Sequence, residues 1–402
     1  MSVVAVINAG SSSIKLAAFE DVTSPRLILR GHIDGIGVNT RMRLLDGSGA
    51  TLSDEPLDAA LEHEDATELL AKRVADCLAG RAIVAVGHRV VHGGPRHSSP
   101  RFVTAELLEE LETFVSLAPL HQPHNLAPIR ALRAARPGLP QVVCFDTAFH
   151  RTQPPVAQTF AIPRKYTDDG VRRYGFHGIS YEYVAARLAD IAPDVASKRV
   201  IIAHLGNGAS LCAIQDGRSV ASTMGFTAVD GLMMGTRSGA LDPGVIIHLM
   251  SHYGLGLKGV EDLLYKQCGL LGVSGVSSDM RRLREADDPR AREAIDLFVY
   301  RIQREIGSLA AALGGLDALV FTAGIGENDA ATRLEVARAC AWIGVRIDEA
   351  KNHAAANEIT GEAARVRTFI IPTNEELRIA MAVRELMNSG PLSHAAALQE
   401  AF

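Results

Sequence analysis

Residues 3–19 read VVAVINAGSSSIKLAAF, and residues 199–214 repeat the same layout as RVIIAHLGNGASLCAI. In each segment an apolar run enters, a turn of Gly, Ser and Asn follows, and a second apolar run leaves. This pattern predicts two strands joined by a small-residue turn. Such turns let backbone N–H groups and hydroxyls approach a phosphate closely. The repeat therefore predicts a duplicated fold whose two halves bind one nucleotide from both sides.

Composition limits the class of protein. The chain has 402 residues, of which 47% are hydrophobic and 22% charged, and this ordinary globular balance and length predict two domains. The net charge of -5, without a long Lys/Arg run, argues against a nucleic-acid partner. No run approaches the roughly 18 apolar residues of a membrane span. The chain enters a strand pattern at its start, so we expect no signal peptide, no membrane partner and a cytoplasmic location.

The cysteines are widely spaced and form no C-x-x-C motif. Most of them have apolar neighbours, so we interpret them as reduced, buried and structural rather than catalytic. They are Cys77, Cys144, Cys212, Cys268 and Cys340.

Strand-like and helix-like patterns alternate along the chain. Strand patterns fall at residues 3–7, 14–19, 83–86, 141–145, 200–204, 211–214, 318–321 and 367–371. Apolar residues at three- and four-residue spacing predict helices at residues 57–78, 105–117, 127–135, 181–191, 291–313, 328–343 and 375–387. Pro56 and Pro289 precede two of these runs, where a helix start tolerates proline. The alternation indicates an α/β fold with mixed sheets.

The same pattern predicts the domain organisation. We expect a first domain at residues 1–150, a second at 151–375, and a helix with a tail at 376–402 that returns to the first domain. The polar, proline-containing stretch at 151–173 is the expected boundary. Residues 388–402 fit either a short extra helix or a frayed end.

Familiar nucleotide and metal motifs are absent. The chain has no P-loop, no protein-kinase H-R-D or D-F-G, and no H-E-x-x-H or paired Cys/His zinc pattern. Glycine-rich segments follow two strand patterns instead, at Gly206–Gly208 and Gly324–Asn328. Both suit phosphate or ribose contacts, but a tight turn with an N-cap at residue 328 or 329 explains the second equally well. We interpret Asp279 as an N-cap and Arg281 as a surface charge.

Charged residues beside glycines are a stronger sign of function. Arg89 lies in GHRVVHGG and Arg237 in GTRSG, and a guanidinium fork suits a carboxylate or phosphate. Asp146 follows a strand pattern, where ligands of α/β proteins bind, although a turn or cap role fits equally. His177 in YGFHG, taken alone, fits a buried structural histidine. Two hairpins, two arginines and carboxylates in Thr373–Glu376 together match the needs of phosphoryl transfer.

The chain resembles the acetate/propionate kinase family. VINAGSSSIK and IIAHLGNGAS resemble its two signatures, and FDTAFH, YGFHG, GLMMGTRSG with LDPG, SSDMR, TAGIGEN and PTNEEL match further motifs in the family's order. The resemblance covers residue 3 to about residue 387. It implies the actin-like ATPase (ribonuclease H-like) fold, with two duplicated domains and a nucleotide cleft between them. That agrees with the internal repeat.

The resemblance implies a reversible phosphoryl transfer between ATP and acetate that gives ADP and acetyl phosphate. It also implies Mg²⁺, for which Mn²⁺ could substitute, and a homodimer. By motif position, Asn8 and Glu375 would hold the metal, and His177 and Arg237 would stabilise the in-line transition state. Asp146 would be the acid/base residue in the family's description. The nucleotide contacts would come from Lys15, His204, Leu205, Gly206, Asn207, Gly208, Asp279, Met280, Arg281, Gly324, Ile325, Gly326, Glu327 and Asn328.

The acyl side is also implied by the resemblance. Arg89 would bind the acetate carboxylate, and Val91, Leu120, Phe176 and position 228 would line the methyl pocket. Acetate is already ionised at neutral pH and needs no strong base. A physical alternative for Asp146 is therefore that it orients Arg89 or Arg237 through an ion pair, or contacts a metal-bound water.

The chain departs from the family in several places. Ile179 and Tyr181 stand where the family usually has Thr and His, and Ala240 stands where it has Asp. HNP becomes His121-Gln122-Pro123, followed by His124 in place of a small residue. Ala228 replaces the usual Pro, which removes about two methylenes of pocket wall, and one methylene is worth roughly 1–3 kcal/mol of discrimination. We therefore expect better tolerance of propionate than in a typical member.

Two rival functions have different consequences. A non-enzymatic, ATP-driven protein of the actin or chaperone type would give Arg89, Arg237 and His177 no small anion to bind. A degenerate relative would bind ATP without turnover. We expect the kinase rather than the first rival, because only a small acceptor gives these three residues a role, while the departures near Tyr181 leave the degenerate relative as the remaining alternative.

Overall fold

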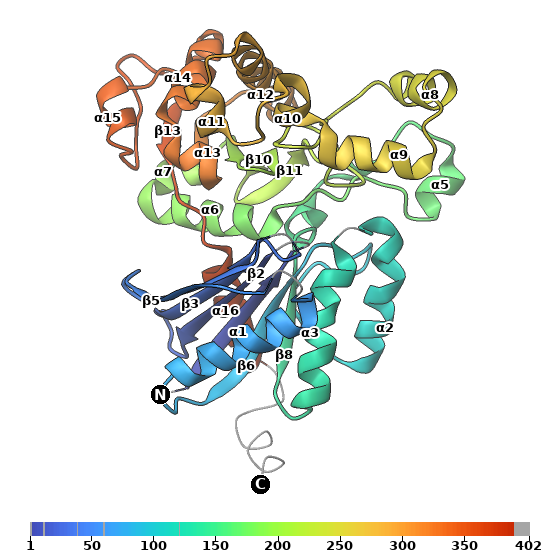
Figure 1. Cartoon of the computed structure of the whole chain (residues 1–402). Coiled ribbons are helices and arrows are strands. Elements are labelled where there is room, and N and C mark those ends of the chain that lie inside the picture. The colour runs from blue at the N-terminus through green and yellow to red at the C-terminus, as the bar shows by residue number, and fades with distance from the viewer. Residues whose placement is uncertain (1, 11–12, 38, 59–60, 120, 390–402) are drawn as a thin grey trace. The chain divides into compact units, whose positions relative to one another are not determined.

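The computed structural model describes residues 2–10, 13–37, 39–58, 61–119 and 121–389 (Figure 1). The chain forms two compact units. The first unit consists of the residues up to Ala148 together with those from Asn374 onward, and the second unit is Phe149–Thr373. Residues 151–173 lie within the second unit. Among the described residues, no helix has both the length and the apolarity to cross a membrane.

A mixed sheet forms the centre of the first unit. Its strand order is β5-β4-β3-β2-β1-β6-β8-β7. The strands are β1 Val3–Ala9, β2 Ser13–Glu20, β3 Leu27–Asp34, β4 Arg41–Asp46, β5 Thr51–Pro56, β6 Ile83–Val90, β7 Arg101–Phe102 and β8 Gln141–Phe145. The helices are α1 His63–Cys77, α2 Ala105–Thr113, the 3-10 turn η1 Phe114–Leu117, α3 Gln122–Ala135 and α16 Glu375–Ser389.

The second unit has a smaller mixed sheet with strand order β11-β10-β9-β12-β13. The strands are β9 Val200–Leu205, β10 Ala209–Gln215, β11 Arg218–Ser222, β12 Ala318–Thr322 and β13 Arg367–Ile370. The longer helices are α6 Gly178–Ile191, α8 Pro243–His252, α12 Pro289–Leu313 and α14 Ala330–Ala339. The shorter ones are η2 Ala148–Thr152, α4 Pro155–Gln158, α5 Arg164–Asp168, α7 Pro193–Ala196, α9 Leu257–Asp262, η3 Leu263–Gln267, α10 Gly269–Ser274, α11 Met280–Glu285, α13 Ala323–Asn328, η4 Ala341–Ile343 and α15 Glu349–His353.

The two sheets share one topology, which confirms the predicted duplication. In the first unit β3-β2-β1 are antiparallel and β6 and β8 then continue parallel to β1. In the second unit β11-β10-β9 are antiparallel, and β12 and β13 continue parallel to β9. The hairpins β1–β2 and β9–β10 are the two segments whose sequences repeat.

Helices cover both faces of the first unit's sheet. α1 and α3 lie on one face and α16 on the other (Figure 1). Val3, Ala5 and Ile7 of β1 pack with Leu70 and Val74 of α1 in a buried apolar cluster. Burial of such side chains contributes about 1.5–3 kcal/mol each, so these faces fix the arrangement of the unit.

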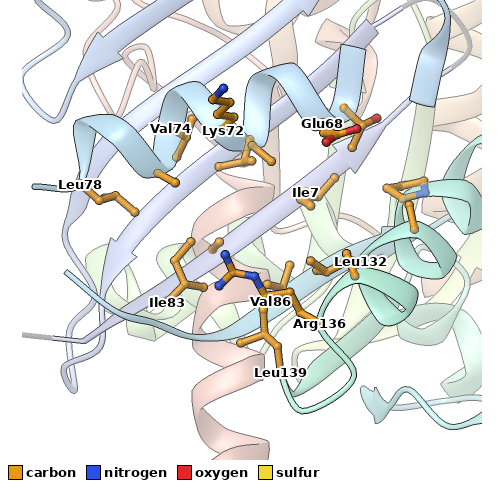
Figure 2. A pocket seen from close by; sticks show the side chains of 18 of the residues that line it. Ile7, Glu68, Lys72, Val74, Leu78, Ile83, Val86, Leu132, Arg136 and Leu139 are labelled. Atoms are coloured by element: carbon orange, nitrogen blue, oxygen red, sulfur yellow. The ribbon is translucent and has the colours of Figure 1, made fainter. Parts of the chain in front are cut away.

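A cavity of about 810 Å³ lies between α1, α3 and the sheet of the first unit (Figure 2). Its apolar lining includes Ile7, Val86 and Leu132, and charged side chains such as Lys72 and Arg136 also line it. None of the site residues expected from the sequence lines this cavity.

Some predicted elements were wrong. Residues 27–56 form β3, β4 and β5, which the sequence patterns missed, and Pro56 ends β5 opposite Arg41 rather than preceding a helix. An edge strand tolerates proline because its N–H is not needed in the sheet. α1 accordingly begins at His63. By contrast, Pro289 does stand in the first turn of α12, after the N-cap Asp288.

Two further expectations need correction. The glycine-rich segment Gly324–Asn328 belongs to helix α13 rather than to a turn, and Asp329 caps the following helix α14. Cys144, Cys212 and Cys340 are buried as expected, but Cys268 is half-buried and Cys77 is exposed. Of residues 388–402, the first two complete α16, and the rest lie outside the described residues.

Gly87 in β6 sets how closely α16 approaches the sheet. A β-carbon at Gly87 would lie 2.5 Å from Ile379 Cγ2 and 2.8 Å from Val383 Cγ2. We expect Gly87→Ala to lower the free energy of unfolding by about 1–3 kcal/mol, because the added methyl overpacks this contact. Gly138→Ala, which meets nothing within 4 Å, is the matched control and should stay within about 0.5 kcal/mol of wild type in urea unfolding. Equal effects of the two substitutions would contradict the contact.

Candidate active site

In the first unit, Arg89 forms the centre of a polar cluster. Its Nε donates to Asp146 Oδ1 at 3.1 Å, and its Nη2 donates to Asp146 Oδ2. Its Nη1 donates to Asn8 Oδ1 at 3.3 Å, and Nε lies 3.5 Å from Glu375 Oε2. These bonds use three of the five N–H groups of a guanidinium, so donors are left for an anion.

Sheet topology brings these four residues together. β1, β6 and β8 are parallel neighbours, with Ile7 beside His88 and Arg89 beside Cys144. Asp146 follows β8 directly, and Glu375 is the first residue of α16. The cluster therefore stands at the carboxyl ends of three strands, where open α/β sheets bind their ligands.

Burial controls the charges in this cluster. It raises the pKa of the Asp146 carboxyl from 3.8 to about 6, an effect that Arg89 opposes and Glu375 increases. Burial by itself would lower the pKa of Arg89, but Asp146 and Glu375 outweigh it and raise that pKa above its ordinary value. Asp146 is thus the member of the pair that changes its protonation near neutral pH, while Arg89 stays charged.

The other expected residues of the first unit are more scattered. Lys15 stands opposite Asn8 in the β1–β2 hairpin, and its side chain is exposed. Val91 is buried, and its N–H donates to Asn125 Oδ1 at 2.9 Å. Leu120 lies outside the described residues.

In the second unit, Arg237 and His177 meet over the turn between β9 and β10. A β-carbon at Gly208 would lie 2.6 Å from Arg237 Nη2 and 3.2 Å from His177 Nε2. The N–H of Gly206 donates to the carbonyl of Gly208 at 3.1 Å and closes the turn. The absence of a side chain at Gly208 therefore lets two nitrogen-bearing groups approach the backbone of a phosphate-type turn.

Glycines also fix the loop that carries Arg237. A β-carbon at Gly235 would lie 2.0 Å from Asn207 Oδ1, and the N–H of Gly235 donates to the Asn207 carbonyl at 3.0 Å. Gly239 has φ +72° and lies against the backbone of Leu232. Arg237 Nη1 donates to the carbonyl of Ala228 at 2.6 Å. Because Gly235 and Gly239 have no side chains, the loop that carries Arg237 can lie directly against Asn207 and Leu232.

His177 and His204 stack on each other, with ring centroids 4.1 Å apart and planes 16° apart. His177 caps α6 with φ 58°, and its Nδ1 lies 2.8 Å from Ser210 Oγ. His204 is the penultimate residue of β9, and its Nδ1 lies 2.8 Å from Ser180 Oγ. His177 is only half-buried, so a structural core histidine does not describe its position.

The backbone before His177 is held by a buried histidine. His150 Nε2 donates to the Phe176 carbonyl at 2.8 Å, and its Nδ1 lies 2.9 Å from Ser219 Oγ. Burial lowers the pKa of His150 to about 4, so the ring is neutral at physiological pH. Gly175 lets the chain pass this ring, because a β-carbon there would lie 2.6 Å from it. Phe176 itself is buried.

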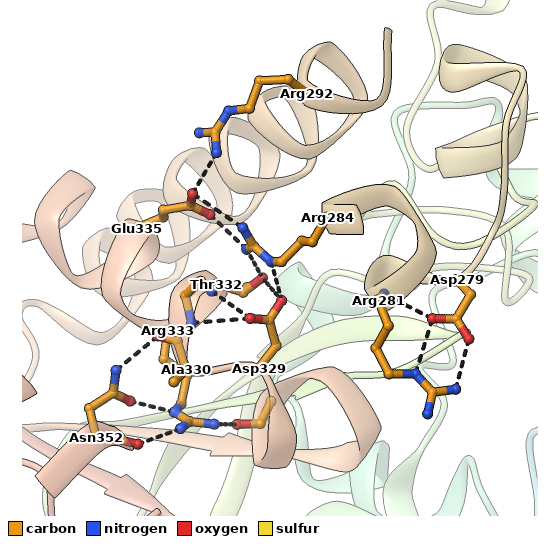
Figure 3. Close-up of polar contacts among 12 residues, drawn as sticks. Asp279, Arg281, Arg284, Arg292, Asp329, Ala330, Thr332, Arg333, Glu335 and Asn352 are labelled. Carbon is orange, nitrogen blue, oxygen red and sulfur yellow. Dashed lines mark hydrogen bonds and ion pairs between the residues drawn. The ribbon is translucent and has the colours of Figure 1, made fainter. Parts of the chain in front are cut away.

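The segment at α11 has the predicted capping role. Asp279 is the N-cap of α11, where its Oδ1 accepts from the Arg281 N–H at 2.9 Å (Figure 3). The side-chain bond from Arg281 lowers the pKa of Asp279 to about 2. Arg281 is 85% exposed, whereas Met280 is buried. Arg281 is therefore a surface charge paired with its own helix cap.

A buried arginine, Arg333, hydrogen-bonds to the backbone of α13. Arg333 Nη1 donates to the carbonyls of Gly326 and Glu327 at 2.9 and 2.8 Å (Figure 3). Its other nitrogens donate to Asn352. Glu327 Oε1 accepts from the N–H groups of Ala323 and Thr373, at 2.8 and 3.0 Å. Glu327 thus joins α13 to the end of the second unit.

Three of these supporting residues were missed from the sequence. All three are buried and have distant partners. Ser210 lies 33 positions from His177, His150 lies 26 and 69 positions from its partners Phe176 and Ser219, and Arg333 lies 19 positions from Asn352. The repeat VIIAHLGNGAS contained one signal, since Ser210 is a hydroxyl within an otherwise apolar strand. The sequence contains no comparable signal for Arg333, because a single arginine in a helix pattern usually faces solvent.

The family comparison matches residues 3–381 to the acetokinase family. An acetate kinase of Rhodopseudomonas palustris is 51% identical over 96% of this chain and 99% of its own length. Among solved structures, a propionate kinase from Francisella tularensis superimposes with a TM-score of 0.89 at 37% identity, covering 95% of this chain and 99% of its own.

An acetate kinase from Porphyromonas gingivalis superimposes with a TM-score of 0.84 at 40% identity, covering 94% of this chain and 98% of its own. The coverage and scores show that the similarity extends over both units and the whole fold.

The burial of Asp146 predicts a pH-dependent stability. Because its pKa rises from 3.8 in the unfolded chain to about 6, the folded state binds this proton more tightly. The resulting stabilisation is complete below about pH 4 and is lost as the pH rises through about 6. Relative to Asp146→Asn, wild type should therefore lose free energy of unfolding between those values, as measured by urea unfolding.

Asp76→Asn on the exposed side of α1 removes one carboxyl without burial and serves as the control. A wild-type minus Asp146→Asn difference that stays flat or rises from pH 4 to pH 6 would contradict the burial effect.

Proposed function

The chain belongs to the acetokinase family, and from this premise we propose that it transfers the γ-phosphoryl group of ATP to acetate. The products are ADP and acetyl phosphate, and the reaction is reversible. The Arg89 cluster is the observation that carries the proposal, because it offers a fixed guanidinium to a small carboxylate.

Arg89 is preorganised for this role. Asp146 holds the Nε–Nη2 side of the guanidinium in a two-bond ion pair, and Asn8 accepts from Nη1. Two N–H groups remain for the oxygens of acetate, an arrangement that suits bidentate carboxylate binding. Asp146 is 1% exposed and accepts from two nitrogens of Arg89, so we propose that it orients Arg89 rather than removing a proton.

The second unit supplies groups that match a phosphoryl group. Arg237 and His177 approach the same point at Gly208, and the turn backbone lies beneath them. Phosphoryl transfer proceeds through spread negative charge on three equatorial oxygens, and fixed donors and cations stabilise that charge. We propose that Arg237 and His177 contact these oxygens while the turn at Gly206–Gly208 binds the nucleotide phosphates.

The bond changes require little acid–base chemistry. One oxygen of acetate forms a bond to the γ-phosphorus as the bond from that phosphorus to the β,γ-bridging oxygen breaks, and ADP leaves. Acetate is already an anion, so no proton must be removed from it. The protein's contribution is therefore positioning and charge stabilisation, to which Arg89, Arg237 and His177 contribute, and no side chain needs to act as a nucleophile.

Asn8 and Glu375 fit a magnesium ion. An amide oxygen and a carboxylate are hard ligands, and both lie against the same guanidinium of Arg89. Among the described residues there is no group of three or more His, Cys, Asp or Glu side chains that could form a metal cage. That suits Mg²⁺, which binds through one or two protein oxygens, waters and substrate phosphates. Bound Mg²⁺ would neutralise phosphate charge, and Mn²⁺ is the proposed substitute.

Propionate is the second candidate substrate. Ala228 stands where the family usually has proline, and its carbonyl accepts from Arg237. One similar solved protein is a propionate kinase. We propose that Ala228 widens the acyl pocket, whose other members would be Val91, Leu120 and Phe176. A homodimer and a cytoplasmic location are likewise proposed from family membership.

A hydroxamate-trapping assay tests the reaction. With ATP, Mg²⁺ and acetate, we expect acetyl hydroxamate to form, and kcat/KM for propionate to fall within about a hundredfold of that for acetate. Arg89→Ala should raise KM for acetate by about tenfold or more, because a charged hydrogen-bonded contact is lost. Arg101→Ala, an exposed arginine of the same unit, is the control. If the wild type forms no acyl phosphate under these conditions, the proposal is wrong.

A methyl group at Gly208 tests the second unit. Gly208 needs no left-handed backbone, so Gly208→Ala should fold, but its β-carbon would displace Arg237 and His177. We expect kcat to fall about tenfold or more, because misplacement of about 1 Å at a reacting group costs up to about a hundredfold. Gly256→Ala, which meets nothing within 4 Å, should retain activity. Full activity of Gly208→Ala would contradict the proposed role of Arg237 and His177 in phosphoryl transfer.

A further inference from the structure

A buried chain of hydrogen bonds runs from Tyr181 to His177 in the second unit. Tyr181 Oη lies 2.5 Å from Ser210 Oγ, and Ser210 Oγ lies 2.8 Å from His177 Nδ1. Tyr181 and Ser210 are both completely buried. The chain thus links the core of α6, through β10, to the ring that approaches the turn at Gly208.

The protons of this chain can be arranged in two ways. In the first, Tyr181 donates to Ser210 and Ser210 donates to His177 Nδ1, which places the proton of the neutral ring on Nε2. In the second, His177 Nδ1 donates to Ser210 and Ser210 donates to Tyr181, which leaves Nε2 without a proton. Because a hydroxyl has one proton to donate, each choice fixes the next one along the chain.

Burial of Tyr181 selects the first arrangement. Among the described residues, Ser210 is the hydrogen-bond partner of the Tyr181 hydroxyl. The second arrangement would leave the Tyr181 O–H without an acceptor in a buried site, and an unsatisfied buried donor costs stability. Burial also raises the pKa of the Tyr181 phenol well above its ordinary value, so this group keeps its proton and acts as a donor.

The opposite nitrogen of His177 faces the proposed phosphate site. His177 Nε2 lies 3.2 Å from the point that a β-carbon on Gly208 would occupy, and Arg237 Nη2 lies 2.6 Å from it. A proton on Nε2 makes the ring a donor at that point, which suits a phosphoryl oxygen. The hydrogen bond at one ring nitrogen sets which nitrogen carries the proton, as in other active-site histidines.

We propose that Tyr181 is a positioning residue that acts through Ser210 to keep the proton of His177 on Nε2. The proposal rests on the proposed kinase function for its catalytic consequence. It also gives Tyr181 a role, at a position where the family usually has histidine. The chain thereby fixes a hydrogen-bond donor for the transferring phosphoryl group before substrate arrives.

The ring nitrogens of His177 report the arrangement directly. The protein has 14 histidines, so its nitrogen-15 ring signals are assigned by their loss in His177→Ala. We expect the wild-type ring to be protonated on Nε2. In Tyr181→Phe and Ser210→Ala, the signals should shift towards a mixture of the two neutral forms, because Ser210 is released or removed. A wild-type ring protonated on Nδ1 would overturn the proposal.

Steady-state kinetics test the consequence. Tyr181→Phe should lower kcat about ten- to a hundredfold with little change in KM, because the wrong form of a catalytic histidine harms the transition state more than binding. Tyr183→Phe on the same helix is the matched control and should match wild type. Thermal unfolding confirms that each variant is folded, and Ser210→Ala provides an independent break in the chain. A kcat for Tyr181→Phe within about twofold of wild type contradicts the proposal.

A double-mutant cycle separates positioning from a general structural role. If Tyr181 acts through His177, Tyr181→Phe should have no further effect on kcat in a His177→Ala background. An equal loss in both backgrounds would overturn the proposal. If wild type forms no acetyl phosphate at all, the kinase function fails, whereas the nitrogen-15 result still decides whether the chain sets the proton of His177.

Discussion

The ion pair between Arg89 and Asp146 is the constraint on which the polar cluster of the first unit depends. It joins the carboxyl ends of β6 and β8, while Asn8 adds β1 and Glu375 adds α16. A half-buried guanidinium needs such partners, since an unpaired charge in this place would be costly. The same bonds fix the direction of the remaining donors. The proposed binding of acetate by Arg89 would therefore depend on the same bonds that hold the cluster together.

In the second unit, glycines rather than ion pairs determine where the polar side chains lie. Gly208 leaves room for Arg237 and His177, and Gly235 lets the loop of Arg237 lie against Asn207. The two repeated hairpins therefore have different surroundings despite a shared topology. The first places Asn8 beside Arg89, which we propose binds acetate, and the second places Gly208 beside Arg237 and His177, which we propose contact the phosphoryl group.

The sequence predicted the duplicated sheets because their central strands are nearly continuous apolar runs. It missed β3, where Arg30 and His32 alternate with the buried Leu29, Gly31 and Ile33, because this strand is not a continuous apolar run. It marked Arg89 and Asp146 separately, but their pairing depends on the register of β6 against β8 across 57 residues. From the sequence, Tyr181 was only a departure from the family's usual histidine. Its contact with Ser210 could not be predicted, because it depends on the packing of β10 beside α6. Local pattern thus predicts the elements, whereas long-range register decides which polar groups meet.

We propose that fixed donors and cations carry out a direct transfer between two bound substrates. In the described cluster Asp146 is committed to Arg89, which leaves it poorly placed to act as a nucleophile. The stereochemical course at phosphorus tests this claim most directly, using ATP with an isotopically chiral γ-thiophosphoryl group. Inversion of configuration in the acetyl thiophosphate product is the predicted result, because one in-line displacement inverts the phosphorus. Retention would contradict the account, since it requires a phosphorylated enzyme between two displacements.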